Sequence, residues 1–327
     1  MSGSATFAYV VMSHHKPEQA LRLARTIQRS SPGSRVLLRH DVPGLFDVAD
    51  ARAAGADVLA SDISARWGHW SLVEATLEAF AHVRDLHRPD WTVLISGQDY
   101  PVRDLRSWED EVLASGIDAI VAGEPFVFGP VGWRVEEDAD WYRVRYTHRW
   151  RWMPRMGVAP RLPSFVVRAA RAAWLRRLRW LEAVVVLNEL PGAAGWALGI
   201  RRGGVPFSAD VPGYMGEQCM ALSRAAVTAA VETDAARRWQ AWYRSSLVPD
   251  EGYFPTVLAH AAGICVQRTG VSYQRWHEEV PLPHPIDITV DVLPEAASSG
   301  RPFARKFDRP EVLDAADRLV FATPAGG

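Results

Sequence analysis

The sequence lacks the features that mark several large protein classes. It has only two cysteines, Cys219 and Cys265, in 327 residues. Two cysteines are too few for a disulfide framework, and their spacing does not suit a metal site, so we expect a reducing compartment. The phosphate loop G-x-x-x-x-G-K-[ST], the dinucleotide motif G-x-G-x-x-G after a strand and the nucleophile motif G-x-S-x-G are all absent. These absences argue against phosphate-loop enzymes, Rossmann dehydrogenases and α/β-hydrolases.

Excess charge and long apolar runs are also missing. The 37 basic and 38 acidic residues give a net charge of −1, so no global field attracts nucleic acid or anionic membrane. The N-terminus passes directly into "FAYVVMSHH" without a basic n-region, and "AVVVL" at 183–187 is too short to span a bilayer. We therefore expect a cytoplasmic protein with no secretory signal, transmembrane segment or nucleic-acid partner.

Short apolar runs alternate with helix-like segments in the first part of the chain. Strands are predicted at 6–12, 34–40, 91–96 and 117–123, and helices at 16–30, from about 70 to 88, and at 105–115. This alternation predicts an α/β fold with a mostly parallel, Rossmann-like sheet and helices on both faces. Ligands bind such sheets outside the carboxyl ends of the strands.

Polar residues follow three of these predicted strands, at 13–17, 39–41 and 96–101. Adjacent histidines such as His14 and His15 rarely hold a metal without further ligands nearby, so hydrogen bonding is the favoured interpretation. Asp99 either faces the ligand crevice or caps a turn ahead of Pro101, and the sequence does not decide between the two.

The alternation is lost in residues 124–190, which are rich in Trp, Arg and Pro. We expect an acceptor-side insertion with one or two basic helices. Interleaved basic and aromatic residues also suit single-stranded nucleic acid, but acidic residues elsewhere cancel the charge. Asp138 and Asp140 form the Asp-x-Asp pattern that can hold a divalent cation on a diphosphate. They lie in an acidic run past a Gly-Pro turn, so a solvated acidic loop is expected instead.

Two segments near the C-terminus offer further chemistry. In "VPDEGYF", Asp250 is suited to cap a helix, which places Glu251 in its first turn. The helix dipole lowers the pKa of a carboxyl there, whereas burial raises it, and Glu251 is either part of a plain helix start or a catalytic base. In "FARKFD", Arg305 and Lys306 form either a diphosphate clamp that needs no metal or a surface strand with outward charges.

Seven motifs in order resemble one known family across residues 7–308. They read "VVMSHHKPEQALRLARTI", "VLLRHD", "RWGHWSLVEATLEAF", "WTVLISGQDYPV", "GEQCMALSRAAV", "LVPDEGYFPTVLAHA" and "RPFARKFD". Together they resemble the core-2/I-branching β-1,6-N-acetylglucosaminyltransferase and peptide O-xylosyltransferase family, glycosyltransferase family 14. Residues 125–200 match only loosely.

The resemblance implies a single GT-A glycosyltransferase domain over 1–327. Residues 1–123 would form the nucleotide-sugar-binding half, and 124–327 the acceptor-binding and catalytic half with the C-terminal diphosphate-binding segment. It also implies an inverting enzyme that transfers GlcNAc or xylose from a UDP-sugar to a hydroxyl of a glycan, glycolipid or natural product. Neither a metal nor another cofactor is expected.

The resemblance also implies roles for individual residues. Glu251 matches the family's catalytic base, and Arg305 and Lys306 match its diphosphate-binding segment. Asp99 matches a carboxylate beside the donor and acceptor sugars. The remaining matches are His14, His15 and Asp41 on the uridine side of the donor, Trp276 near the acceptor, and Trp67 with Gly68 shaping the pocket. Trp141 and Arg145, in the expected acceptor-side insertion, are further candidates for binding the acceptor.

The chain also departs from the animal members, which have a membrane anchor and many disulfide cysteines. It therefore resembles a bacterial, cytoplasmic relative, and His284 lies where some members have an additional arginine. The other interpretation is a non-catalytic nucleotide-sugar or carbohydrate-binding protein on the same fold, because a fold does not determine an activity.

Overall fold

A computed structural model describes residues 5–41, 47–126, 138–154, 184–188, 195–277 and 285–321. For residues 138–142, 154, 184–188 and 195–196 it describes the backbone alone. The predictions for Trp141 and His284 therefore concern side chains outside the described residues.

Within the described residues, seven strands form the central sheet, in the order β11-β6-β10-β4-β1-β2-β3. Their bounds are β1 Phe7–Ser13, β2 Arg35–His40, β3 Ala56–Val58, β4 Trp91–Ser96, β6 Ala119–Pro125, β10 Tyr214–Ser223 and β11 Val266–Gln267. All of them run parallel except β10, which lies antiparallel between β4 and β6. The predicted mostly parallel α/β sheet is confirmed.

Side chains of β1 alternate between two apolar cores, one on each face of the sheet. Phe7, Tyr9 and Val11 join one core, and Ala8 and Val10 join the other. This alternation follows from the two-residue period of a strand. Because β1 lies inside the sheet and both its faces are buried, all seven of its residues are buried.

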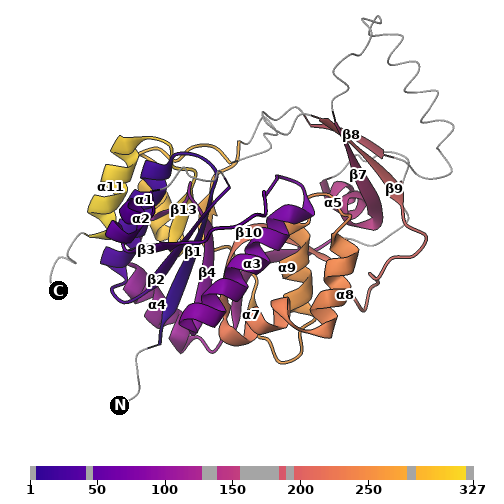
Figure 1. The fold of residues 1–327 in the computed structure, drawn as a ribbon, viewed down its shortest axis with the longest axis horizontal. Helices are drawn as coiled ribbons and strands as arrows, with labels where there is room; N and C mark the ends of the chain where they lie inside the picture. The colour runs from indigo at the N-terminus through magenta and orange to yellow at the C-terminus, as the bar shows by residue number, and fades with distance from the viewer. Residues whose placement is uncertain are drawn as a thin grey trace, which may run out of the picture.

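Helices cover both faces, as predicted (Figure 1). One core contains side chains from α1 Pro17–Ser30, α2 Val48–Ala53, α4 Leu105–Ala114, α10 Leu293–Ser298 and α11 Pro310–Val320. The other contains side chains from α3 Trp70–His87, α7 Arg224–Val231, α8 Asp234–Tyr243 and α9 Asp250–Ala259. None of the helices in the described ranges is long and apolar enough to cross a membrane.

The ends of the predicted helices have local causes. Pro17 opens α1, where its missing N–H is not needed. Asp104 caps α4 by accepting a hydrogen bond from the Ser107 N–H at 2.8 Å. Helix α3 ends at Arg88, which has a left-handed backbone and precedes a proline. These signals are readable in the sequence, and all three predicted helices are confirmed within a few residues.

The middle of the chain differs from the prediction. Helix α5, Asp138–Thr147, is followed by β7 His148–Pro154, which pairs antiparallel with β9 Gly195–Arg201; β9 also pairs with β8 Val184–Asn188 (Figure 1). In β7 the aromatic residues Trp150 and Trp152 alternate with arginines, a strand period rather than a helical one. Within 124–190, where one or two basic helices were expected, α5 is a helix and 148–154 is a strand. The arginine-rich stretch at 166–180 lies outside the described residues.

A second small sheet brings the C-terminal segment beside the central sheet. It consists of β12 Ser272–Gln274, β13 Phe303–Arg305 and β5 Tyr100–Pro101. Beyond β13, the Phe307 N–H donates to the Gln98 carbonyl at 2.9 Å. Residues near 305 thus lie next to the end of β4, which is more than 200 positions earlier in the sequence.

Strand β10, Tyr214–Ser223, contains a bulge. Gly216 pairs with Gly123 and Met220 with Val121, so residues 217–219 lie opposite Ala122 alone. We call residues 217–219 the β10 bulge. A Cβ added at Gly216 would lie 1.8 Å from the Ala122 carbonyl oxygen, so only glycine fits the position before the bulge.

The Gly216→Ala substitution should therefore destabilise the protein. We expect its free energy of unfolding, measured in urea, to fall by about 2 kcal/mol or more, because the clash is with backbone that cannot move aside. Gly203→Ala is the control, since an added Cβ there meets no atom within 4 Å. It should change stability by less than about 0.5 kcal/mol. Equal stability of the two variants would contradict the assigned bulge.

Candidate active site

A cavity of about 960 Å³ lies at the carboxyl ends of the central strands. Residues that follow β1, β2 and β4 line it, together with the first turn of α9 and the segment after β13. This is where a mostly parallel sheet binds ligands. Of the residues predicted for the site, eight line this cavity: His14, His15, Asp41, Trp67, Glu251, Trp276, Arg305 and Lys306.

Glu251 lies in the first turn of α9, at the wall of the cavity. Its Oε2 accepts a hydrogen bond from Nη1 of Arg145 at 2.7 Å. Arg145 was predicted to bind the acceptor; it does not line the cavity, and it forms an ion pair with this carboxylate. The arginine of α5 thus acts on the site through Glu251.

The backbone before Glu251 is held in an unusual conformation. Val248 has a φ of 48°, which is rare for a β-branched residue, and its N–H donates to the Gly68 carbonyl at 3.1 Å. A Cβ added at Gly252 would lie 2.6 Å from the ring of Tyr146. The tyrosine therefore packs directly against the first turn of α9, which fixes the position of Glu251.

Asp250 does not cap α9, contrary to the prediction. The helix is capped by Pro249, whose backbone is already helical and whose carbonyl accepts from the N–H of Tyr253 at 2.8 Å. Asp250 is thus inside the helix and cannot reach back to its free N–H groups. It is 5% exposed, and its Oδ1 has no hydrogen-bond partner among the described residues.

Burial controls the protonation of both carboxyls. It raises the pKa of Asp250 to about 7, helped by the neighbouring charge of Glu251 and opposed by Arg145. Burial also raises the pKa of Glu251, while the charge and hydrogen bond of Arg145 lower it. At Glu251 the effect of burial is therefore larger than the opposing effect of Arg145.

Arg305 and Lys306 line the cavity, so the surface-strand interpretation is wrong. The reason is that Phe303 and Phe307, on either side, are fully buried and turn the strand's end inward. Burial opposes the charge of Arg305, but Asp99 and the groups around it raise its pKa. The pKa of Lys306 is lowered, first by burial and then by the charge of Arg305.

Asp99 is fully buried and does not line the cavity, so the expectation that it faces the crevice is wrong. It accepts hydrogen bonds from the Ser96 N–H at 2.8 Å and from the Ser272 hydroxyl, and it lies 3.7 Å from the Cys219 Sγ. The turn interpretation is correct, because the carboxylate closes the turn that follows β4. Its charge acts on the cavity by stabilising the Arg305 guanidinium.

His14, His15 and Asp41 lie together at the end of the cavity beyond β1 and β2. The two histidine rings are 4.4 Å apart, and the pKa of each is lowered, chiefly by burial. Neutral rings offer hydrogen bonds rather than charge. Asp41 is ion-paired with the buried Arg39 and accepts a hydrogen bond from the Ala65 N–H at 3.3 Å. This pairing fixes its carboxylate at the rim.

Aromatic side chains also line the cavity. Trp67 and Trp276 line it and are among the most exposed large apolar residues, at 43% and 52%. Gly68, with a φ of 74°, follows Trp67 and accepts the hydrogen bond that holds Val248. Exposed aromatic faces at a cavity suit flat, partly apolar ligands such as sugar rings.

No group of three or more His, Cys, Asp or Glu side chains that could hold a metal ion occurs in the described part of the chain. Asp138 and Asp140 begin helix α5 rather than forming the acidic loop that was expected, since acidic residues favour a helix N-terminus. Their side chains lie outside the described set.

Several polar residues of the cavity were not found from the sequence. They are Arg66, Glu217, Gln218, Arg268, Gln274 and Arg301. One signal was available for two of them: "GEQCMALS" places Glu217 and Gln218 directly before a fully apolar strand end. Polar residues inside a central strand indicate a bulge or a site.

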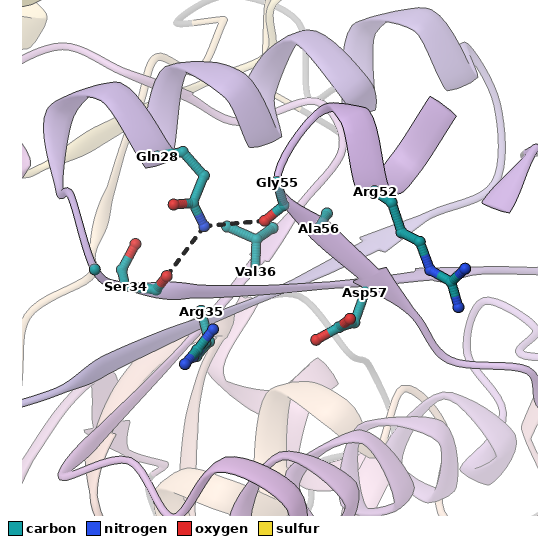
Figure 2. Close-up of a pocket in the computed structure, with 9 residues that line it drawn as sticks. Gln28, Ser34, Arg35, Val36, Arg52, Gly55, Ala56 and Asp57 are labelled. Atoms are coloured by element: carbon teal, nitrogen blue, oxygen red, sulfur yellow. Dashed lines mark hydrogen bonds between the residues drawn. The ribbon is translucent and has the colours of Figure 1, made fainter. Parts of the chain in front are cut away.

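A smaller cavity of about 380 Å³ lies at the opposite edge of the sheet, where β2 and β3 begin. Figure 2 shows Gln28 across it, donating to the carbonyls of Ser34 and Gly55, each at 3.0 Å. None of the predicted site residues lies there. The candidate active site is therefore the larger cavity.

The fold and the cavity define an α/β protein with its ligand site at the carboxyl edge of a mostly parallel sheet. Residues 200–294 match the family model of the Core-2/I-Branching enzyme. This stretch contains β10, α9 and Glu251, so the resemblance drawn from the sequence is confirmed for this part of the chain. The comparison with curated proteins finds no match.

Solved structures overlap the chain only in part. Glucosyl-3-phosphoglycerate synthase from Mycobacterium tuberculosis is 15% identical, covering 60% of this chain and 57% of its own, with a TM-score of 0.27. HddC from Yersinia pseudotuberculosis is 10% identical, covering 36% and 58%, with a TM-score of 0.27. Rv0371c from Mycobacterium tuberculosis is 19% identical, covering 36% and 66%, with a TM-score of 0.25. The chain thus spans less than two thirds of each of these proteins, and similarity of this extent carries no conclusion about activity.

The raised pKa of Asp250 predicts a stability difference that depends on pH. Its folded-state pKa, about 7, lies above the ordinary value, so the folded protein holds this proton more tightly than the unfolded chain. Stability is lost as pH rises from about 4 to 7, and Asp250→Asn removes that loss. The melting temperature of Asp250→Asn at pH 8 should exceed that of wild type by about 2–4 °C, with a smaller difference at pH 5.

Asp234→Asn is the control, because Asp234 is exposed and its pKa is lowered by Arg237. It should not stabilise the protein at either pH. A gain for Asp250→Asn that is the same at pH 5 and pH 8 would contradict the assigned ionisation.

Proposed function

We propose that the protein is an inverting glycosyltransferase of the GT-A type, with Glu251 as general base. It transfers a sugar from a UDP-sugar to an acceptor hydroxyl without a metal ion. The match to the Core-2/I-Branching enzyme model supports glycosyltransferase activity. The observation that carries the finer proposal is that Glu251, Arg305 and Lys306 line one cavity.

Glu251 has the geometry that a general base needs. Arg145 holds its Oε2, and Oε1 has no hydrogen-bond partner among the described residues. Oε1 takes the proton of the acceptor hydroxyl as that oxygen attacks the anomeric carbon. Burial makes the carboxylate more basic, and Arg145 keeps it ionised, so the two effects together suit proton transfer near neutral pH.

Arg305 and Lys306 stabilise the leaving group in this proposal. The bond from the anomeric carbon to the diphosphate oxygen breaks on the side opposite the attack, and UDP leaves with the negative charge. Both cations are already in place: the Lys306 carbonyl accepts from the Ile288 N–H at 2.8 Å, and the adjacent Phe307 N–H donates to Gln98. Charges positioned before the reaction stabilise the transition state without reorganisation.

The remaining walls of the cavity suit the two ends of the substrates. His14, His15 and Asp41 offer hydrogen bonds for the uridine, as the family resemblance implies. Trp276 and Trp67 offer aromatic faces for an acceptor sugar or a natural-product ring. A donor carrying GlcNAc or xylose and an acceptor hydroxyl on a glycan, glycolipid or natural product fit this arrangement.

Removal of the base should abolish transfer while donor binding survives. We expect Glu251→Gln to lower the turnover of UDP-sugar by about 10²- to 10⁴-fold. UDP affinity, measured by calorimetry, should stay near the wild-type value because the cations are unchanged. Glu311→Gln, at an exposed position in α11, is the control and should keep full turnover. Wild-type transfer by Glu251→Gln with intact donor binding would rule out this base.

Chelation should have no effect on transfer if Arg305 and Lys306 supply the positive charge. Turnover of the UDP-sugar is measured in excess EDTA, and again after Mn²⁺ is added in excess over the chelator. We expect equal rates in both. A complete loss of activity that Mn²⁺ restores would overturn the metal-independent mechanism and return Asp138 and Asp140 to consideration as ligands.

A further inference from the structure

The β10 bulge places polar side chains in the middle of the central sheet. Strand β10 lies between β6 and β4, and directly after the bulge Met220, Ala221 and Leu222 are fully buried. Glu217 and Gln218 instead line the large cavity. Bulges that re-aim side chains are common beside active sites, and this one places Glu217 and Gln218 on the wall of the cavity that Arg305 and Lys306 also line.

Both side chains contain a buried atom without a partner. The Oε2 of Glu217 and the Nε2 of Gln218 have no hydrogen-bond partner among the described residues. Leaving a polar atom unsatisfied costs about 1–3 kcal/mol, so the two together are a considerable burden for a folded protein. One is a hydrogen-bond acceptor and the other a donor, and a bound molecule with hydroxyl groups satisfies both.

The orientation of Glu217 is restricted by its neighbours. Gln274, another residue of the cavity wall, interacts with the Glu217 carboxyl and lowers its pKa. On the other side, a Cβ added at Gly270 would lie 2.7 Å from Oε2. The Glu217 carboxyl thus lies between the side-chain amide of Gln274 and the backbone of Gly270. In this position it requires no large rearrangement before a ligand binds.

The surrounding charges define which kind of group fits. Burial raises the pKa of the Glu217 carboxyl, whereas the charges of Arg301 and Arg305 lower it and favour the ionised form. Because positive charges balance the negative charge here, the site has no net negative charge that would attract a protonated amine. A carboxylate would meet repulsion from Glu217. A neutral hydroxyl suits the position, since it donates to the Glu217 oxygen and accepts from the Gln218 amide.

The location next to Arg305 indicates which part of the donor is involved. In the proposed function Arg305 binds the diphosphate, and the transferred sugar is bonded directly to that diphosphate. Glu217 interacts electrostatically with Arg305 and lines the same cavity. The uridine is bonded to the other end of the diphosphate, and the proposed function places it at His14, His15 and Asp41. Glu217 is therefore assigned to the sugar of the donor.

We propose that Glu217, with Gln218, hydrogen-bonds the hydroxyl groups of the transferred sugar and selects neutral sugar donors against uronic-acid donors. This inference rests on the proposed function and adds a specificity-determining residue to it. Neither residue takes part in proton transfer or in stabilising the leaving group.

The test compares donor use by wild type, Glu217→Gln and Glu217→Asp. The donors are UDP-GlcNAc, UDP-xylose, UDP-glucose and UDP-glucuronate, and hydrolysis or transfer gives kcat/KM for each. Glu217→Gln should lower kcat/KM for the best neutral donor by about 10- to 100-fold, which corresponds to a hydrogen bond to a charged group. Its use of UDP-glucuronate relative to that donor should rise.

Glu217→Asp keeps the negative charge near the two arginines but has a shorter side chain. This variant can therefore be tested if Glu217→Gln does not fold. It should also lose kcat/KM on the best neutral donor while still discriminating against UDP-glucuronate. The affinity for UDP itself, measured by calorimetry, should be unchanged in both variants. Glu311→Gln again serves as the charge-matched control and should keep the wild-type donor preference.

The outcomes separate this inference from the proposed function. Wild-type donor preference in Glu217→Gln, with UDP binding and transfer intact, overturns the inference and leaves the proposed function standing. Preference of the wild type for UDP-glucuronate over every neutral donor also overturns it. A wild-type protein that binds no UDP and turns over no UDP-sugar instead refutes the proposed function on which the inference rests.

Discussion

The ion pair between Arg145 and Glu251 is the interaction on which the candidate site depends. It joins α5, from the middle of the chain, to the first turn of α9 at 2.7 Å. Without the arginine, a buried carboxyl would hold its proton and could not accept another. The backbone around Arg145 is also tied in place, because its carbonyl accepts from the Leu247 N–H at 3.2 Å and from the Trp150 indole at 3.0 Å. The segment that differs most from a parallel α/β pattern thus holds the proposed base.

A second pairing of buried charges supports the other side of the cavity. Asp99 is out of contact with the cavity, yet its charge stabilises Arg305, whose guanidinium lies 3.8 Å from the Cys219 Sγ. The proposed base, Glu251, and the proposed diphosphate-binding Arg305 are therefore each stabilised by an opposite charge. A different part of the chain supplies each of these charges. Such pre-positioned charges are what electrostatic catalysis requires. They also explain why the site needs the small sheet of β5, β12 and β13, which brings residues near 100 and 305 together.

The parts of this architecture that depend on local signals were predictable from the sequence. The two-residue alternation of β1, the proline at the start of α1 and the cap of α4 determine elements without reference to distant residues. Glu251, Arg305 and Lys306 were found through ordered motifs. The orientation of Asp99 was not, because a carboxylate after a strand can turn either toward a crevice or into its own turn. The β10 bulge and the Arg145 contact depend on pairing between segments about 90 or more positions apart, which composition and periodicity do not encode.

The adjacent carboxyls Asp250 and Glu251 illustrate how the surroundings distinguish two similar groups. Both are near the cavity and both have raised pKa values because of burial. Like charges this close resist being ionised together, so one proton tends to stay on the pair. Arg145 contacts the carboxylate of Glu251, whereas an oxygen of Asp250 has no partner among the described residues. The proton is therefore retained by Asp250. Glu251 is left ionised with one oxygen available, and this asymmetry supports Glu251, rather than its neighbour, as the base.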